Sequence, residues 1–304
     1  MSSPAAQSEP LPEILRGRTV VVLGAGKVGR AVAGRLHDAG LRIAAMTARS
    51  LATAQRAAER TGAEPGTDNT AAANCGDIVL VTSGDAAIAG VVAEVAEAGG
   101  FRPGQLVIHM SGALRLSALT PAAEAGATIG CAHPLQSFAS AEDAERAIPG
   151  STFGITPGPG AREVLEALVQ VLSGTAVLVA DEAKPLYHAA AVVASNYLVA
   201  VEDMAVHLLV SAGFDESSAL AALRPLVTGT AANAASLGTT SALTGPIVRG
   251  DVGTVRGHVD ALRQLAGSEL GLYRALGRHT LEIATRRGTL SAETIGELRD
   301  VLAE

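Results

Sequence analysis

Short apolar runs alternate with amphipathic stretches over the first 180 residues of the chain. Buried strands are predicted for the aliphatic runs Thr19–Leu23, Leu41–Met46, Ile78–Thr82, Leu106–His109 and Thr128–His133. Helices are predicted between them, at Leu51–Thr61, Ala86–Glu97 and Leu116–Ala125. Strands that alternate with helices of about ten residues predict a parallel, doubly wound sheet.

The pattern changes near residue 181. Before it, Ser151–Ile155 and Thr175–Val179 flank a helix at Ala161–Leu172 and are expected to extend the same sheet. After it, only helical periodicity is found, over Glu182–Ala212, Ser217–Leu237, Thr254–Ala275, Leu281–Arg287 and Ser291–Leu302, the last with Ser291 as N-cap. We therefore expect a mobile lead-in at 1–16, an α/β domain at 17–180 and an all-helical domain at 181–304.

One segment of the helical half, Ala189–Ala200, is apolar on nearly every side. A surface helix of a monomer has a polar face, so this segment is expected to be buried. An interface with a second copy of the chain would bury it, and a homodimer formed through the helical domain is predicted.

Composition restricts the partners. The net charge of −7 argues against nucleic acid or an anionic membrane, and the longest apolar stretches are interrupted by polar residues, so no membrane span is expected. Cys75 and Cys131 have no metal-ligand spacing, and no metal is predicted. They are consistent with a reducing compartment. Without a signal-peptide pattern at the N-terminus, a cytoplasmic protein is expected.

The clearest motif follows the first strand. There the chain reads Gly24-Ala25-Gly26-Lys27-Val28-Gly29 and continues into an amphipathic helix. Such a strand, glycine turn and helix start binds a dinucleotide pyrophosphate, because the free N–H groups of the helix face the anion and the glycines allow a tight turn and close approach. A doubly wound parallel Rossmann sheet followed by an all-α C-terminal domain is therefore predicted.

The end of the second strand indicates which dinucleotide binds. Sites that prefer NAD(H) have an acidic residue there, which accepts hydrogen bonds from the ribose 2′-hydroxyl. This chain has Arg49 and Ser50 instead, and a cation with short donors suits a 2′-phosphate. NADP(H) is predicted in preference to NAD(H), with a solvated Arg49 as the alternative.

Polar residues also follow the other strands of the predicted sheet, where ligands of such sheets bind. Thr82 and Ser83 are expected to contact the ribose and nicotinamide, and Ser111 the nicotinamide or the substrate. His109 and His133 end two neighbouring strands and are candidate substrate contacts; packing or turn histidines are the alternative.

The helical half supplies the remaining candidates. Lys184 and His188 are four residues apart and share a helix face, which Asn196 approximately continues. Carbonyl reduction leaves charge on oxygen, so Lys184, His188 and Asn196 are the candidate catalytic residues. Thr244 and Arg249 lie in a connector between two helices and could bind a substrate carboxylate. Each has a structural alternative. Lys184 could be a solvated first-turn lysine, His188 and Asn196 a satisfied core pair, and the connector a plain turn.

Together these segments resemble a group of Rossmann-like oxidoreductases whose C-terminal half is a helical domain of unknown function. The resemblance rests on GAGKVG at 24–29, HMSGAL at 109–114, AHPLQSF at 132–138, YHAAAVVASNYLVA at 187–200 and LTGPIVRGD at 243–251. This group is similar to pyrroline-5-carboxylate reductase, ketopantoate reductase and β-hydroxyacid dehydrogenases. The resemblance implies NADP-linked hydride transfer and a dimer through a helical domain like that of 6-phosphogluconate dehydrogenase.

Ketopantoate reductases have a lysine and an asparagine four residues apart at the start of that helix. Lys184 matches the lysine, but His188 replaces the asparagine. The expected activity is hydride transfer between NADP(H) and a small carboxylate-bearing carbonyl or hydroxy compound, with 2-ketopantoate as the most concrete substrate. An imine reductase of the pyrroline-carboxylate type and an NADP(H)-binding protein without turnover are the alternatives.

Overall fold

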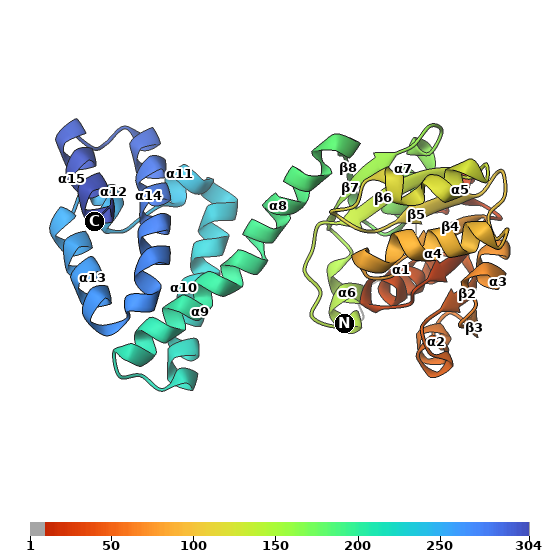
Figure 1. Cartoon of the computed structure of the whole chain (residues 1–304), viewed down its shortest axis with the longest axis horizontal. Coiled ribbons are helices and arrows are strands. Elements are labelled where there is room, and N and C mark those ends of the chain that lie inside the picture. Colours follow the sequence, from red (N-terminus) through yellow and green to blue (C-terminus); the bar gives the residue numbers. More distant parts are fainter. Residues whose placement is uncertain (1–9, 304) are drawn as a thin grey trace, which may run out of the picture. The chain divides into compact units, whose positions relative to one another are not determined.

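The structure is a computed structural model that describes residues 10–303. The chain divides into two compact units, Met1–Ser195 and Asn196–Glu304 (Figure 1). The second unit begins 15 residues after the expected start at 181, because the helix that contains Lys184 packs on the first unit through that buried side chain. Of the expected lead-in, residues 1–9 lie outside the described part. Glu13–Leu15 forms a 3-10 turn with a fully buried Leu15, so this part is not loose.

The described residues of the first unit form an eight-stranded sheet in the order β3-β2-β1-β4-β5-β6-β7-β8. The strands are β1 (Thr19–Leu23), β2 (Arg42–Thr47), β3 (Glu64–Gly66), β4 (Ile78–Val81), β5 (Leu106–His109), β6 (Thr128–Pro134), β7 (Thr152–Pro157) and β8 (Thr175–Leu178). Strands β1 to β6 are parallel, and the order reverses direction at β1, which is the topology of a doubly wound sheet. The predicted fold class is confirmed.

Strand β7 departs from the parallel arrangement. It pairs antiparallel with β6, with Pro134 opposite Phe153, and β8 runs parallel to β7. Strand β6 extends past the end of β5 by Ala132, His133 and Pro134, and β7 begins beside this extension. The chain that leaves β8 consequently arrives level with Cys131, at the carboxyl edge of β5.

Helices cover both faces of the sheet (Figure 1). The helices of this unit before residue 180 are α1 (Lys27–Asp38), α2 (Leu51–Ala58), α3 (Asn69–Asn74), α4 (Asp85–Glu97), α5 (Thr120–Glu124), α6 (Ala141–Ala147) and α7 (Arg162–Val171). One core joins α1, α2, α6 and α7 to the sheet, and the other joins α3, α4 and α5. The sequence pattern missed β3, α3 and α6, which have only three to seven residues each and, in β3, a proline.

The long helix predicted at Glu182–Ala212 is interrupted. Helix α8 (Lys184–Ala194) ends at Ser195, whose φ of −121° and ψ of −67° are not helical, and α9 (Asn196–Ser211) begins the second unit. Asn196 was expected to continue the face of His188, and the break removes the helical register on which that expectation depended.

The described part of the second unit is helical throughout. It contains α9, α10 (Glu216–Leu237), α11 (Thr239–Ala242), α12 (Pro246–Arg249), α13 (Val252–Leu265), α14 (Leu270–Arg287) and α15 (Ala292–Ala303). Its core lies between α12, α13, α14 and α15. The break predicted near residue 280 was wrong: the chain turns at Gly267–Glu269, and α14 runs unbroken from there to the left-handed Gly288.

The apolar segment Ala189–Ala200 is not buried within one chain. Val193, Tyr197 and Val199 are 58–66% exposed, contrary to expectation. Burial by a second copy of the chain stays a prediction. The stretch Asp181–Ser211, which contains an 18-residue window with a mean hydropathy of 1.4, is the one helical stretch among residues 10–303 that is long and apolar enough to cross a membrane by length and composition. Its beginning packs on protein, since Lys184 is buried there.

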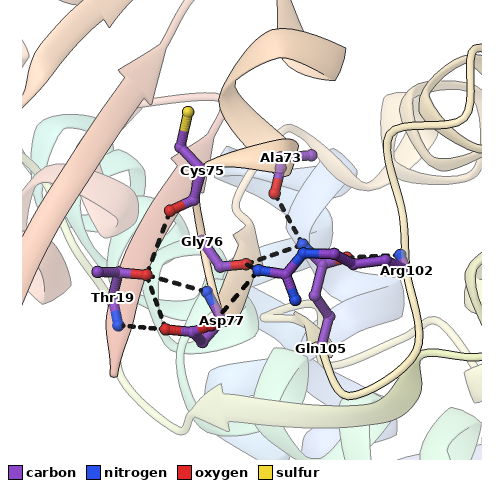
Figure 2. A network of polar contacts seen from close by, with 7 residues as sticks. All are labelled: Thr19, Ala73, Cys75, Gly76, Asp77, Arg102 and Gln105. Carbon is purple, nitrogen blue, oxygen red and sulfur yellow. Dashed lines mark hydrogen bonds and ion pairs between the residues drawn. The ribbon is translucent and has the colours of Figure 1, made fainter. Parts of the chain in front are cut away.

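A polar network ties the amino ends of β1, β4 and β5 together (Figure 2). The Thr19 backbone N–H and hydroxyl both donate to Asp77 Oδ2 at 2.9 Å, and Arg102 donates to Asp77 Oδ1 at 3.4 Å. Gln105, fully buried, donates to the carbonyls of Ala73 and Gly76 at 2.8 Å. These bonds fix the sheet at the edge opposite its carboxyl end.

Replacement of Asp77 by Ala should lower the free energy of unfolding at pH 7 by about 1–2 kcal/mol, because two donors of Thr19 lose their acceptor. Hydrogen bonds from Thr19, first its backbone N–H, lower the pKa of Asp77. A carboxyl with a lowered pKa stabilises the fold above its unfolded pKa and loses this effect as pH falls through the folded value. Urea unfolding of both proteins should therefore show a smaller difference in acid. Glu94→Ala, an exposed helical change, is the control, and a difference that is independent of pH would contradict this account.

Candidate functional site

The glycine turn between β1 and α1 leaves backbone donors free. Ala25 N–H donates to Thr47 O at 2.7 Å, and the first helical bond of α1 runs from Arg30 N–H to Gly26 O at 3.0 Å. The N–H groups of Lys27, Val28 and Gly29 precede that bond and have no acceptor within the helix. Three donors at a helix N-terminus form a site for an anion such as a phosphate.

The three glycines of the turn serve different purposes. Gly24 has a φ of +86°, which favours glycine. A Cβ on Gly29 would lie 2.3 Å from Thr82 Oγ1, so close packing on β4 excludes a side chain there. Gly26 has an ordinary φ of −78°, and the nearest atom to a Cβ there would be 4.0 Å away. The protein itself therefore does not require glycine at position 26, whereas a ligand lying on the turn would.

Thr82 and Ser83 pack against this turn. The Thr82 hydroxyl donates to Gly24 O at 2.7 Å, which holds the turn on the end of β4. A Cβ on Gly24 would lie 2.4 Å from Ser83 Oγ. Both residues thus shape the turn directly, a role that sequence did not suggest.

A cavity of about 320 Å³ opens beside the turn, at the carboxyl ends of β1, β4 and β5, and its volume falls in the range of small-molecule sites. It is lined by Lys27, Val28, Val81, Thr82, Ser83, Gly84, Asp85, Met110 and Ser111. Five residues predicted to bind the cofactor are therefore brought together: Lys27, Val28, Thr82, Ser83 and Ser111. The Lys27 ammonium itself donates to Ala139 O at 2.6 Å.

Arg49 and Ser50 follow β2, as predicted. Arg49 is exposed, and Ser50 is the N-cap of α2, where its hydroxyl accepts from Thr53 N–H at 3.3 Å. The last residue of β2, Thr47, is buried and donates to Asn69 Oδ1 at 2.6 Å. No carboxylate stands at this strand end.

Ser111 connects the cavity to a buried polar cluster. Its N–H donates to His109 Nδ1 at 3.2 Å, and its hydroxyl accepts from the N–H groups of Ala113 and Leu114. His109 is fully buried, and this burial, followed by the charge of Lys184, lowers its pKa to about 3. His109 is therefore a neutral residue that shapes the strand end, which favours the packing alternative over direct contact with substrate.

Lys184, at the start of α8, is 1% exposed. Its ammonium donates to Ser111 O at 3.1 Å and to Cys131 Sγ at 3.0 Å. It forms no ion pair with any of residues 10–303. Burial raises the pKa of the Cys131 thiol although Lys184 opposes this, so the cysteine keeps its proton. The alternative of a solvated first-turn lysine is wrong.

His133 and His188 lie close to Lys184 on β6 and α8. Their ring centroids are 6.2 Å apart, and His133 Nδ1 is 2.9 Å from the hydroxyl of Tyr187. Burial, followed by the charge of Lys184, lowers the pKa of His133 to about 4. A side chain on Gly112, next to Ser111, would lie within 2.9 Å of both rings, so the two histidines enclose this backbone.

Three predicted residues lie in the other unit. Asn196 begins α9, and Thr244 and Arg249 are exposed in the connector around α12. Their assignment to catalysis or substrate binding stays a prediction. The predicted site did not include Tyr187, Cys131 and Asp85, which complete the first-unit cluster and cavity. The available signals were the position of Tyr187 next to His188 and the positions of Asp85 and Cys131 in strand-end segments.

Comparisons with known families and structures agree with this architecture. The Rossmann-like domain matches residues 1–134, and the domain of unknown function DUF2520 matches residues 151–280. The chain therefore combines a Rossmann-like domain with a DUF2520 domain. No curated protein matches the sequence.

Several solved structures share the fold. A Bacteroides fragilis protein provisionally named an NADP oxidoreductase has a TM-score of 0.70 at 24% identity and covers 87% of this chain and 98% of its own. A reductive aminase from Aspergillus terreus, in complex with NADPH and ethyl-5-oxohexanoate, has a TM-score of 0.59 at 18% identity, covering 94% and 92%. A pyrroline-5-carboxylate reductase from Coxiella burnetii has a TM-score of 0.55 at 17% identity, covering 93% and 98%.

Lys184→Met should leave the fold at least as stable, because a buried ammonium without a counter-charge costs several kcal/mol. It should also raise the pKa of His109 and His133, since Lys184 lowers both. Thermal unfolding and a histidine NMR titration measure these effects. Unchanged histidine pKa values, with the fold intact, would contradict the proposed electrostatics of the cluster.

Proposed function

We propose that this protein is an NADP(H)-dependent oxidoreductase that transfers hydride to or from a small substrate bearing a carboxylate and a carbonyl or hydroxyl group. The observation that carries the proposal is Gly26: neither its φ nor its packing requires glycine, yet it borders three free N–H groups and the cavity. A pyrophosphate lying on the turn explains both features.

The positions of the polar groups around the turn and the cavity suit the pyrophosphate, the ribose 2′-phosphate and the nicotinamide of this cofactor. The start of α1 would hold the pyrophosphate, and Arg49 would pair with a ribose 2′-phosphate, for which the end of β2 offers no repelling carboxylate. Thr82, Ser83 and Ser111 line the cavity toward the end of β5, where the nicotinamide would extend. The solved structures of similar fold named NADP oxidoreductase, or bound to NADPH, support the preference for NADP(H).

NADPH, when bound, supplies hydride from its nicotinamide ring. Lys184 provides fixed positive charge beside Ser111, which favours the oxygen that becomes negative in a carbonyl reduction. Because the ammonium is enclosed and two of its hydrogens are already donated, we assign it this electrostatic role in preference to proton donation. The imidazoles of His133 and His188 lie beside it, and they would orient the substrate or carry the proton.

A 2-oxo acid, with 2-ketopantoate first, is the proposed substrate, because the buried positive charge favours an anionic ligand. Reduction of a cyclic imine is the second candidate. It is favoured by the fold shared with a reductive aminase and a pyrroline-5-carboxylate reductase.

Two glycine variants test the cofactor site. Gly26→Ala should fold normally and weaken NADPH binding at least about tenfold, or 1.4 kcal/mol, because its methyl group occupies the place of the phosphates. Gly29→Ala, the matched variant, should instead destabilise the fold by about 1–3 kcal/mol through its contact with Thr82. Calorimetric titration with NADPH and with NADH, alongside thermal unfolding, separates the two effects. Equal NADPH affinity in Gly26→Ala and the parent protein would contradict the site.

Turnover tests the reaction. NADPH oxidation should accompany reduction of 2-ketopantoate, and absorbance of the reduced nicotinamide measures it. NADPH oxidation with 1-pyrroline-5-carboxylate but not with 2-ketopantoate would establish the imine reductase alternative instead. Tight NADPH binding without oxidation by either compound would favour a binding protein without turnover.

A further inference from the structure

The hydroxyl of Tyr187 and the imidazole of His133 form a defined pair. Their hydrogen bond is 2.9 Å long, and the rings meet edge to face at 87° with centroids 5.6 Å apart. Strand β7 makes room for this pair, because Gly154, opposite His133 in the sheet, has no side chain: a Cβ there would lie 2.5 Å from Tyr187 Oη. The geometry therefore depends on a residue outside the pair as well.

Both members of the pair are neutral at pH 7. His133 is neutral at pH 7, with a pKa of about 4, and burial raises the pKa of Tyr187, so the phenol keeps its proton. Their hydrogen bond allows either group to donate, and the relay described below uses the arrangement in which the phenol donates to Nδ1 and the imidazole carries its hydrogen on Nε2. This nitrogen faces Gly112, beside the cavity residue Ser111.

We propose that Tyr187 and His133 relay the proton that completes the reduction. The inference rests on the proposed function. His133 Nε2–H gives its hydrogen to the oxygen or nitrogen of the reduced substrate, while Nδ1 takes the hydrogen of the Tyr187 hydroxyl. One N–H and one O–H bond break, and one N–H and one O–H (or N–H) bond form. A proton from solvent then returns to Nε2 as Nδ1 gives its hydrogen back to the tyrosinate, which restores the starting tautomer. Tyr187 acts through His133 and is a positioning residue.

The surroundings favour a relay over a direct acid. A neutral imidazole is a poor acid unless its other nitrogen is protonated in the same step, and the phenol is placed to do so. The titratable groups that face the pair are Lys184 and His188 on α8, Cys131 on β6, His109 on β5 and Asp85 on α4. Lys184 adds positive charge, which opposes formation of an imidazolium.

The first test does not require turnover. Long-range ¹H–¹⁵N NMR of histidine in the full-length protein should show His133 protonated at Nε2 only and neutral down to about pH 4. His133→Asn assigns the signal. In Tyr187→Phe the Nδ1 signal should shift and both tautomers should appear. A parent protein protonated at Nδ1, or a signal unchanged by Tyr187→Phe, would overturn the pair.

The second test measures turnover with NADPH and 2-ketopantoate, or 1-pyrroline-5-carboxylate if only the imine reacts. Tyr187→Phe should lower kcat by about 10²-fold with KM little changed. Gly154→Ala, which displaces the hydroxyl without removing it, should lower kcat in the same direction. The parent kcat should stay flat between about pH 5 and 9 and fall as Tyr187 ionises. This alkaline limb should vanish in Tyr187→Phe.

The chain offers a matched control. Tyr273 and His258 form a second tyrosine–histidine hydrogen bond of 2.9 Å in the other unit, where His258 is exposed. Tyr273→Phe should leave kcat unchanged. A kcat retained in Tyr187→Phe, or an acid limb near pH 6–7 that reports an imidazolium donor, would overturn the relay alone. A parent protein that oxidises no NADPH with either compound would overturn the proposed function and the relay with it.

Discussion

The arrangement of this protein depends on three backbone N–H groups at the start of α1 that have no acceptor among the described residues. Helix geometry frees them, Gly24 turns the chain toward them, and the contact of Gly29 with Thr82 brings the helix against β4. Because β1, β4 and β5 are parallel, their carboxyl ends meet at this point and place Ser83 and Ser111 around one cavity. The proposed chemistry follows from that convergence.

A second constraint is the buried ammonium of Lys184. It has only a carbonyl and a thiol as partners among the described residues, and its charge helps to keep His109 and His133 neutral. The extension of β6 beyond β5 and the antiparallel β7 bring Lys184 to this position, because they return the chain to the level of Cys131 before α8 begins. Departure from a purely parallel sheet thus positions the cluster.

Local pattern was sufficient to predict the strands of the parallel sheet other than β3, the glycine turn and the residues at the strand ends. It failed where long-range contacts decide. Strand β3 contains Pro65, and its pairing with the edge of β2 is not visible in the local pattern. The helix break at Ser195 has no glycine or proline that would predict it. The Tyr187–His133 bond joins positions 54 residues apart and depends on Gly154. The expected burial of Ala189–Ala200 is not met within a single chain, because composition alone does not show what covers an apolar helix.

The central claim is that the free N–H groups of α1 bind a dinucleotide phosphate. Hydrogen–deuterium exchange of the full-length protein, with and without saturating NADPH, tests it most directly. The account predicts slower exchange in the peptide that spans Gly24–Arg30, together with the one that ends β4 at Thr82–Asp85. Exchange at both peptides that NADPH leaves unchanged would contradict it.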